Sequence, residues 1–350
     1  MTEDEDLLDT NLLRGFQYAC RPDCGLCCFA EPRVDPSERA RLLRIAPVPE
    51  FVEGGGATYL RARPEGGACG LLVDLRCSAH GARPHPCREF PIHVHLGHRL
   101  QASLVLSCPG VGLEELGDAR PFDVREDPVG LDAEMASVLG RIESASPRRL
   151  SEAGRRRARL VRTLERAGRW VEEEEVRAEL RGAIPFPGTV DYPVEDPPSA
   201  DDGLELLPLY FDGRSGPVAL AGGLGGWEAL ELRSSGGVAR HLGAIPPPSV
   251  PPRIAREGEA LLRGYLAYFL ERDLLFASVV PRMVEAEEGS VTEWIEEELR
   301  RIGATVVSRA LVRAKVSGGG INPLTSAEIA DGIRATDQDL MDVPTWGDRL

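Results

Sequence analysis

All eight cysteines of this 350-residue chain lie between residues 20 and 108, and five of its six histidines lie in the same stretch. Such a density of cysteine is typical of a disulfide scaffold or of a metal-binding domain. The sequence starts Met-Thr-Glu-Asp-Glu-Asp, which lacks the basic and apolar regions of a secretory signal, so we expect a cytoplasmic protein. Because thiols stay reduced in that compartment, the cysteines indicate metal binding or catalysis rather than disulfides.

The spacing of the cysteines predicts a thiolate-ligated centre. The first cluster is Cys20-Arg-Pro-Asp-Cys24-Gly-Leu-Cys27-Cys28, whose proline and glycine favour tight turns. Thiolates select zinc or iron–sulfur clusters over hard cations, and eight of them could supply one centre or two. The predicted metal ligands are Cys20, Cys24, Cys27, Cys28, Cys69, Cys77, Cys87 and Cys108, with His80 as an auxiliary ligand.

Other polar residues near the cysteines have supporting roles in this interpretation. Arg83 and Arg88 lie on either side of Cys87. We expect them to be cofactor-binding residues that do not ligate the metal but stabilise the negative charge of the thiolate centre through their own charge and hydrogen bonds. His93 and His95 share one face of a predicted strand, with Cα atoms about 7 Å apart. We interpret them as the polar outer face of a hairpin rather than as a chelating pair.

The same residues resemble a known family. The order Cys24-Gly25-Leu26-Cys27-Cys28, Cys69, Cys77, Arg83-Pro84, Cys87-Arg88, Phe90-Pro91 and Cys108-Pro109-Gly110 is similar to that of YkgJ-type proteins. These carry a CxxCxxCC zinc- or iron-chelating domain that is also described as containing an Fe–S cluster. The resemblance spans residues 20–110. It departs from the family in the three-residue gap after Cys20 and in the loss of a tyrosine after Cys77, around His80.

The choice of metal depends on the first cluster. Structural zinc prefers paired C-x₂-C knuckles, and Cys24–Cys27 is the single clean pair. The C-x₃-C-x₂-C run from Cys20 to Cys27 is more typical of an iron–sulfur protein, so a [4Fe–4S] cluster is favoured over Zn²⁺. The run also fits a radical S-adenosylmethionine signature, which is disfavoured because no serial strand–helix alternation follows residue 28.

The whole chain is predicted to be α+β, with a small metal-stabilised cysteine-rich domain followed by a mixed helix and antiparallel-sheet region. Helices are expected over 7–16, from Asp35-Pro36-Ser37-Glu38, within 133–181, over 254–276 and 290–315, and from about 326. A hairpin is expected over 91–106, and a small antiparallel sheet over 204–242. The predicted domains are an acidic leader (1–19), a cysteine-cluster domain (20–115), a helical segment (116–182), a β-rich segment with proline-rich flanks (183–252) and a helical C-terminal region (253–350).

Charge and hydropathy limit the possible partners. The net charge of −15 disfavours a nucleic-acid binder. The sequence contains no run of eighteen apolar residues that could form a transmembrane helix, so we expect no membrane partner. The arginines from 155 to 169 precede Glu172–Glu175, which favours a solvated helix with intrahelical ion pairs.

Three functional hypotheses follow from these patterns. The first is a metal-binding protein that holds a [4Fe–4S] cluster or zinc. The second, suggested by the flagellin lysine-N-methylase members of the family, is an S-adenosylmethionine-dependent protein lysine N-methylase-like enzyme. The third is a zinc-stapled protein-interaction module, in which residues 120–350 bind a protein substrate or partner.

Overall fold

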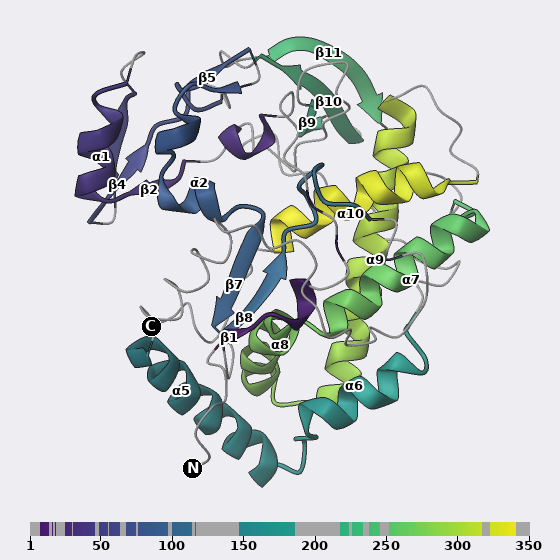
Figure 1. The fold of residues 1–350 in the computed structure, drawn as a ribbon. Coiled ribbons are helices and arrows are strands. Elements are labelled where there is room, and N and C mark those ends of the chain that lie inside the picture. Colours follow the sequence, from purple (N-terminus) through teal and green to yellow (C-terminus); the bar gives the residue numbers. More distant parts are fainter. Residues whose placement is uncertain are drawn as a thin grey trace.

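The computed structural model describes residues 8–13, 16, 18, 25–29, 31–45, 49–54, 56–63, 68–74, 76–96, 100–113, 116, 147–185, 218–223, 226–233, 238–245, 252–316 and 323–340. Short helices and small sheets from the N-terminal third lie beside a body of long helices (Figure 1). This arrangement confirms the predicted α+β class. Within the described ranges, every helix is too short or too polar to cross a membrane.

Short elements dominate the cysteine-rich region. Strands β2 (Arg33–Val34), β4 (Ala57–Leu60) and β3 (Phe51–Gly54) form an antiparallel sheet, and β5 (Leu72–Val73) pairs with β6 (Arg76–Cys77). The helices here are α1 (Pro36–Leu42) and α2 (His85–Glu89), with 3₁₀ turns η2 (Leu26–Phe29) and η3 (His80–Ala82). Helix α1 begins where predicted, because Asp35 and Glu38 cap it reciprocally.

A three-stranded sheet joins this region to the helices. Strands β7 (Ile92–Leu96) and β8 (Leu100–Leu104) form the predicted hairpin, whose turn at 97–99 lies outside the described residues. The helix predicted over 7–16 is wrong. Strand β1 (Leu8–Asp9) pairs in parallel with β8, and a 3₁₀ turn, η1 (Asn11–Leu13), follows. The Asp9 carboxylate accepts the Asn11 N–H, a local turn that competes with helix formation.

The helical body comprises six described helices: α5 (Pro147–Arg166), α6 (Glu173–Arg181), α7 (Arg256–Leu270), α8 (Asp273–Ala286), α9 (Val291–Val316) and α10 (Ser326–Leu340). The single helix predicted over 254–276 is in fact α7 and α8. The chain is extended at Arg272, and the Gln101 side chain accepts the Asp273 N–H at 2.7 Å, which starts α8 afresh. Residues 133–146 lie outside the described ranges.

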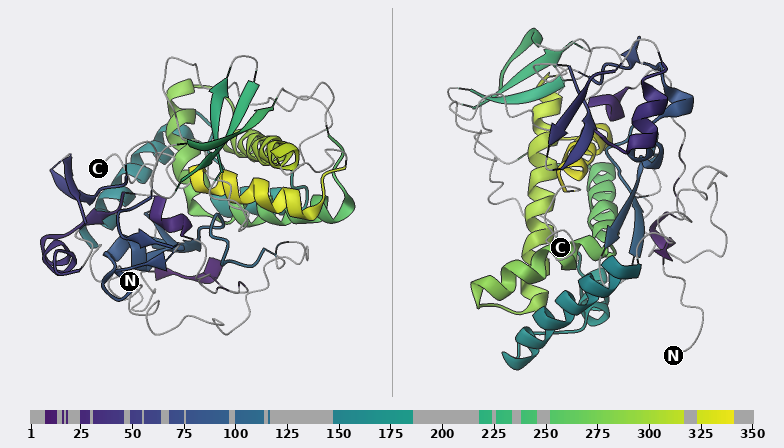
Figure 2. Two further views of the ribbon diagram at one scale, coloured as in Figure 1. Left: turned by 90° about the horizontal axis from the view of Figure 1, so that it is seen from above. Right: turned by 90° about the vertical axis from the view of Figure 1, so that its left-hand side faces the viewer.

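The sheet predicted over 204–242 is present over 218–245 as an antiparallel meander, and residues 204–217 lie outside the described ranges. It contains β9 (Val218–Gly223), β10 (Gly226–Leu232) and β11 (Val238–Ile245), with β10 in the centre. The pairing of β10 with β11 shifts register twice, after Ala229 and after Glu231. The sheet lies against one end of α9, away from α5 and α6 (Figure 2).

Two hydrophobic cores hold these elements. The main core combines side chains of the β7–β8 hairpin with those of α5 to α10, so the hairpin is packed as part of the helical body. A much smaller core lies under α1 and the β2–β4–β3 sheet and consists of Val34, Leu42, Leu60, Cys69, Leu71 and Ala79. Half-buried Cys28 and Cys77 pack against this small core.

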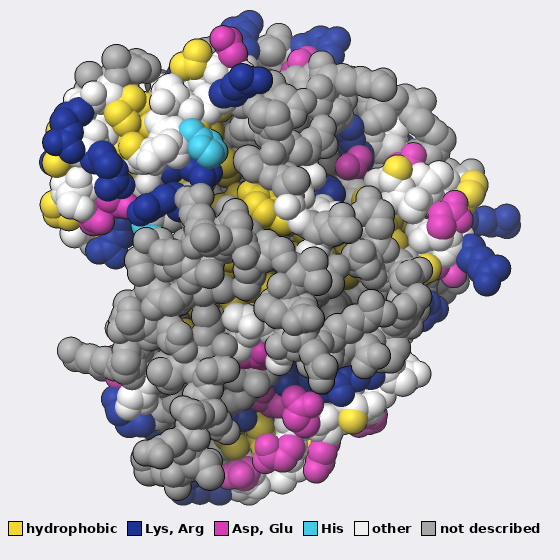
Figure 3. All heavy atoms as spheres, viewed as in Figure 1, with side chains coloured by type: hydrophobic (Ala, Val, Ile, Leu, Met, Phe, Trp, Pro, Cys, Tyr) yellow, Lys and Arg dark blue, Asp and Glu magenta, His cyan; other side chains and the backbone are white. Residues whose placement is uncertain are grey.

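The surface charge is uneven. Basic side chains gather on the lobe that carries α1, β4 and α2, whereas acidic ones gather at the opposite end, where α6 lies (Figure 3). Residues 19–109 contain eleven arginines against nine acidic residues, although the whole chain has a charge of −15. The cysteine-rich region is therefore slightly basic within an acidic protein.

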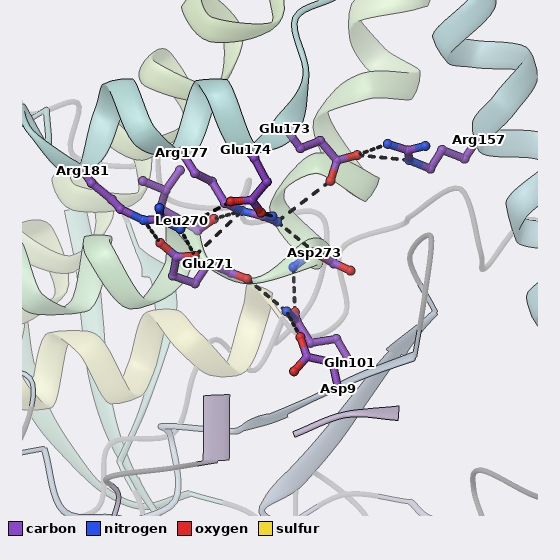
Figure 4. Close-up of polar contacts among 10 residues, drawn as sticks. All are labelled: Asp9, Gln101, Arg157, Glu173, Glu174, Arg177, Arg181, Leu270, Glu271 and Asp273. Atoms are coloured by element: carbon purple, nitrogen blue, oxygen red, sulfur yellow. Dashed lines mark hydrogen bonds and ion pairs between the residues drawn. The ribbon is translucent and has the colours of Figure 1, made fainter. Parts of the chain in front are cut away.

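A buried polar network connects strand β8 to α6 and α8 (Figure 4). Arg177 of α6 donates to Asp273 at 2.9 Å and to Glu174 at 2.6 Å, and Gln101 of β8 donates to the Glu271 carbonyl at 3.1 Å. Arg157 of α5 pairs with Glu173 of α6 at 2.8 Å. The intrahelical pairing predicted for the arginine run is wrong here, because α5 ends before the glutamates and the pair joins two helices.

The two ends of the cysteine-rich segment meet beside the helical body. An isolated antiparallel bridge pairs Tyr18 with Val111, on either side of the eight cysteines. Both residues pack with the main core, Val111 as a buried member and Tyr18 as a half-buried neighbour.

Candidate metal centre

Five cysteine thiols come together from four separate segments. Cys27 and Cys28 lie in η2, Cys69 lies just before β5, Cys77 ends β6, and Cys87 lies in α2. Each is buried or half-buried and belongs to no disulfide. We refer to Cys27, Cys28, Cys69, Cys77 and Cys87 as the thiol cluster.

Backbone hydrogen bonds fix how these segments meet. The Cys69 N–H donates to the Cys28 carbonyl at 2.6 Å, which ties η2 to the turn before β5. The Cys28 N–H donates to the Gly25 carbonyl at 3.0 Å, and Gly25 has a φ of 64°, a left-handed conformation that glycine adopts without strain. The glycine of the first cysteine block therefore permits the turn that brings Cys27 and Cys28 toward the other thiols.

Cys28 lies between two other thiols and hydrogen-bonds to both. These hydrogen bonds lower the pKa of Cys27 to about 7 and that of Cys77 to about 6, while they raise the pKa of Cys28 itself. The nearby Arg83 guanidinium lowers the pKa of Cys27 and of Cys77 further. Two of the five thiols therefore reach the thiolate form, which is the metal-binding form, near neutral pH.

The other two thiols are protonated more readily. Burial raises the pKa of Cys87 to about 12, and burial also raises the pKa of Cys69. The Cys69 sulfur accepts the Leu71 N–H at 3.4 Å. Negative charge on Cys27 and Cys77 further raises the pKa of both groups, which shows that all of these sulfur atoms share one electrostatic environment.

The two arginines predicted to support the cysteines occupy different places. Arg83 donates to the His80 carbonyl at 3.0 Å and to the Cys87 carbonyl at 3.4 Å, which holds its charge beside the thiol cluster. Arg88 instead faces the buried carboxylate of Glu38, 3.5 Å away. The side chain of His80 is exposed, and its role as a ligand stays a prediction.

Glu38 is a structural residue of the site that the sequence interpretation treated only as part of a helix start. Its carboxylate accepts the His85 N–H at 2.8 Å, so α1 holds the beginning of α2, two residues before Cys87. The run from Asp35 to Glu38 indicated the helix start, but no local pattern indicated a contact with a residue 47 positions later.

Cys108 has different surroundings. It is buried in the main core with the helices, and its carbonyl accepts a hydrogen bond from Arg334 of α10 at 2.6 Å. In contrast, Cys69 of the thiol cluster belongs to the small core, and Cys28 and Cys77 pack against that core. The structure thus groups five of the predicted ligands and places the sixth on a loop that the helical body holds.

Cys20 and Cys24 lie outside the described residues. Among the residues that are described, no group of three or more His, Cys, Asp or Glu side chains is arranged to hold a metal ion. The chemistry of the donors nevertheless fits a thiophilic metal, because closely spaced thiols with two lowered pKa values lie beside an arginine. The thiol cluster would hold it, and the family resemblance adds Cys20, Cys24 and Cys108 as expected ligands.

The predicted polar outer face of the hairpin is wrong for His95. This side chain is buried, and its Nε2 atom lies 2.9 Å from the Ser103 hydroxyl, on the facing strand. The Nδ1 atoms of His93 and His95 are 3.0 Å apart. Burial, with smaller contributions from the charges of His93 and Arg272, holds the pKa of His95 well below its usual range. His95 is therefore a neutral core residue, because α5 and α8 pack against β7.

Comparisons with known proteins agree with this site. Residues 19–109 match a family model named CxxCxxCC and described as a "putative zinc- or iron-chelating domain". The match confirms the resemblance drawn from the cysteine pattern and covers about a quarter of the chain. Neither the curated proteins nor the solved structures contain a match.

Proposed function

We propose that this protein binds zinc or iron through its cysteine thiolates and that the bound group is a [4Fe–4S] cluster. The observation that carries the proposal is the thiol cluster, in which Cys28 hydrogen-bonds to both Cys27 and Cys77 beside the Arg83 guanidinium. The match of residues 19–109 to a zinc- or iron-chelating domain supports the same chemistry.

Two features favour the cluster over zinc. The run Cys20-x₃-Cys24-x₂-Cys27 is closer to the ligand spacing of iron–sulfur proteins than to paired zinc knuckles. A thiolate-ligated cluster carries net negative charge, which the Arg83 guanidinium and the slightly basic character of residues 19–109 would stabilise. When bound, such a cluster supplies a site for electron transfer or for organising a ligand.

The direct experiment is to purify the full chain without oxygen and to measure iron, zinc and acid-labile sulfide per chain with the visible spectrum. About four iron and four sulfide with a broad visible absorbance would support the cluster. About one or two zinc ions per chain and a colourless solution would favour the zinc-stapled interaction module over the iron–sulfur cluster. A chain that holds neither metal after reconstitution with iron and sulfide, and after incubation with Zn²⁺, would overturn the proposal.

Variants locate the site. Cys27→Ser and Cys87→Ser should each lower the metal content strongly, because each removes a thiolate of the thiol cluster. His93→Ala, which changes a half-buried side chain on β7 outside that cluster, is the matched control and should retain the metal. Equal losses in all three variants would contradict the assignment of the ligands to the cysteines.

The S-adenosylmethionine-dependent enzyme stays a prediction of the resemblance, since no contact among the described residues favours it. Saturating S-adenosylmethionine should raise the melting temperature of the reconstituted protein if the enzyme hypothesis is correct, because a ligand of the folded state stabilises that state.

A further inference from the structure

One arginine of the last helix holds the loop that carries Cys108. Arg334 of α10 donates through Nη1 to the carbonyls of Leu106 and Cys108, at 3.1 and 2.6 Å, and through Nη2 to the carbonyl of Val111, at 3.0 Å. A guanidinium presents several N–H donors in a rigid planar fork, so contacts to three carbonyls fix the direction of the backbone on both sides of Cys108.

The rest of α10 reinforces this contact. One turn after Arg334, the Asp337 carboxylate accepts the Leu106 N–H at 2.6 Å. The same carboxylate pairs with Arg272, which donates to the Leu104 carbonyl at 2.6 Å. The end of β8 and the loop after it are thereby held at Leu104, Leu106, Cys108 and Val111 by Arg272, directly before α8, and by side chains of α10.

The loop has little means of holding this shape by itself. Its internal backbone hydrogen bonds join Cys108 to Val105 at 3.2 Å and Val111 to Cys108 at 3.0 Å. Pro109 cannot donate a backbone hydrogen bond, and Gly110 and Gly112 restrict the chain least of all residues. A ligand thiol on such a loop needs external support, because metal binding requires its sulfur at a defined position.

We propose that Arg334 is a positioning residue for Cys108 and that helix α10 completes the metal site from outside residues 19–109. This inference rests on the proposed function, in which Cys108 is a metal ligand. Arg334 acts on the backbone that carries the thiol, so its loss should weaken metal binding through Cys108 alone and leave the thiol cluster around Cys28 in place.

The test uses Co²⁺ as the metal probe on the full-length apoprotein, because thiolate-to-cobalt absorbance rises with the number of thiolates bound. Cys108→Ser should reduce this absorbance at saturation. Arg334→Leu should raise the Co²⁺ dissociation constant about 10- to 100-fold, the usual effect of removing a residue that supports a metal ligand. In the Cys108→Ser background, Arg334→Leu should cause little further loss, because the two changes act on one ligand.

Two further variants separate positioning from general destabilisation. Arg334→Lys keeps one charged donor and should restore part of the affinity. Arg313→Leu is the matched control, because Arg313 pairs with Asp331 of α10 at 3.0 Å and forms part of the α9–α10 contact. It should lower the melting temperature without changing the cobalt absorbance.

The outcomes distinguish the two proposals. No Co²⁺ absorbance from the wild type, or an unchanged absorbance in Cys108→Ser, would contradict the proposed metal site or the place of Cys108 in it. A loss in Cys108→Ser with none in Arg334→Leu, or equal losses in Arg334→Leu and Arg313→Leu, would overturn the role of Arg334 and leave the metal site standing. If Arg334→Leu does not fold, the Arg334→Lys titration decides, and wild-type affinity in that variant would overturn the positioning role.

Discussion

The Nη1 atom of Arg272 lies 2.5 Å from the Oδ1 atom of Asp337, and both side chains are fully buried. The pair joins the start of α8 to α10, and each partner also bonds the backbone next to β8. A buried ion pair is costly to break from one side, because the remaining charge stays buried without an opposite charge beside it.

We therefore expect Arg272→Met to lower the free energy of unfolding by about 3 to 5 kcal/mol. The measurement is urea unfolding followed by circular dichroism. Arg300→Met removes an exposed arginine that pairs with exposed Glu297 at 3.3 Å and is the control, with an expected loss below about 1 kcal/mol. Similar losses in the two variants would contradict the stabilising role assigned to burial of the Arg272–Asp337 pair.

The pH dependence of stability should reveal His95. Burial lowers the pKa of this imidazole in the folded protein, whereas the unfolded chain restores a value of about 6.5. The unfolded state then binds more protons below that pH, so stability from neutral His95 is complete above about pH 6.5 and is lost as the pH falls below it.

His95→Gln should abolish this component. Between pH 6.5 and 5, we expect the wild type to lose about 1 to 2 kcal/mol more stability than His95→Gln, as measured by urea unfolding at each pH. His241→Gln, at an exposed position of β11, is the control and should follow the wild type. If the stabilities of the wild type and His95→Gln fall in parallel, His95 does not cause the pH dependence of stability between pH 6.5 and 5.

Removal of the metal should affect the two cores differently. The small core under α1 contains few side chains, so its elements should depend on the metal, whereas the main core is held by packed helices. We expect a strong chelator to accelerate amide hydrogen exchange in α1, β2–β4 and β5–β6 and to leave α7 to α10 protected. Equal acceleration in both regions would indicate a single cooperative unit.

Glu38 should support the site through the backbone. Glu38→Ala removes the acceptor of the Asp35 and His85 N–H groups, and we expect a loss of about 1 to 3 kcal/mol in stability together with weaker metal binding. Glu38→Gln keeps an acceptor oxygen and should recover part of both. Glu50→Ala, at an exposed carboxylate 3.8 Å from Arg61, is the control and should change stability by less than about 0.5 kcal/mol.

Local patterns predicted the elements that depend on neighbouring residues. The run Asp35-Pro36-Ser37-Glu38 predicted the start of α1, and alternating apolar residues predicted the β7–β8 hairpin. The cysteine pattern predicted a family resemblance over residues 20–110, and the family model matches residues 19–109. Each of these signals is contained within a short stretch of sequence.

The errors come from contacts between distant residues. The break between α7 and α8 depends on Gln101, which is 172 positions before Asp273. The strand at Leu8–Asp9 exists because β8 offers an edge, and His95 is buried because helices cover the hairpin. Arg334 gave no sequence signal, since nothing in its own helix indicates a loop 223 to 228 positions earlier.

The bridge between Tyr18 and Val111 has a thermodynamic consequence. The bridge joins the two ends of the segment that carries the cysteines, and it does not depend on a bound metal ion for its hydrogen bonds. Joining the ends of a flexible segment costs conformational entropy that grows with its length, and here the helical body supplies that closure in advance. In an excised fragment of residues 19–109, the free energy of metal binding would have to offset the entropy of closing the loop. The fragment should therefore bind the metal ion more weakly than the intact chain.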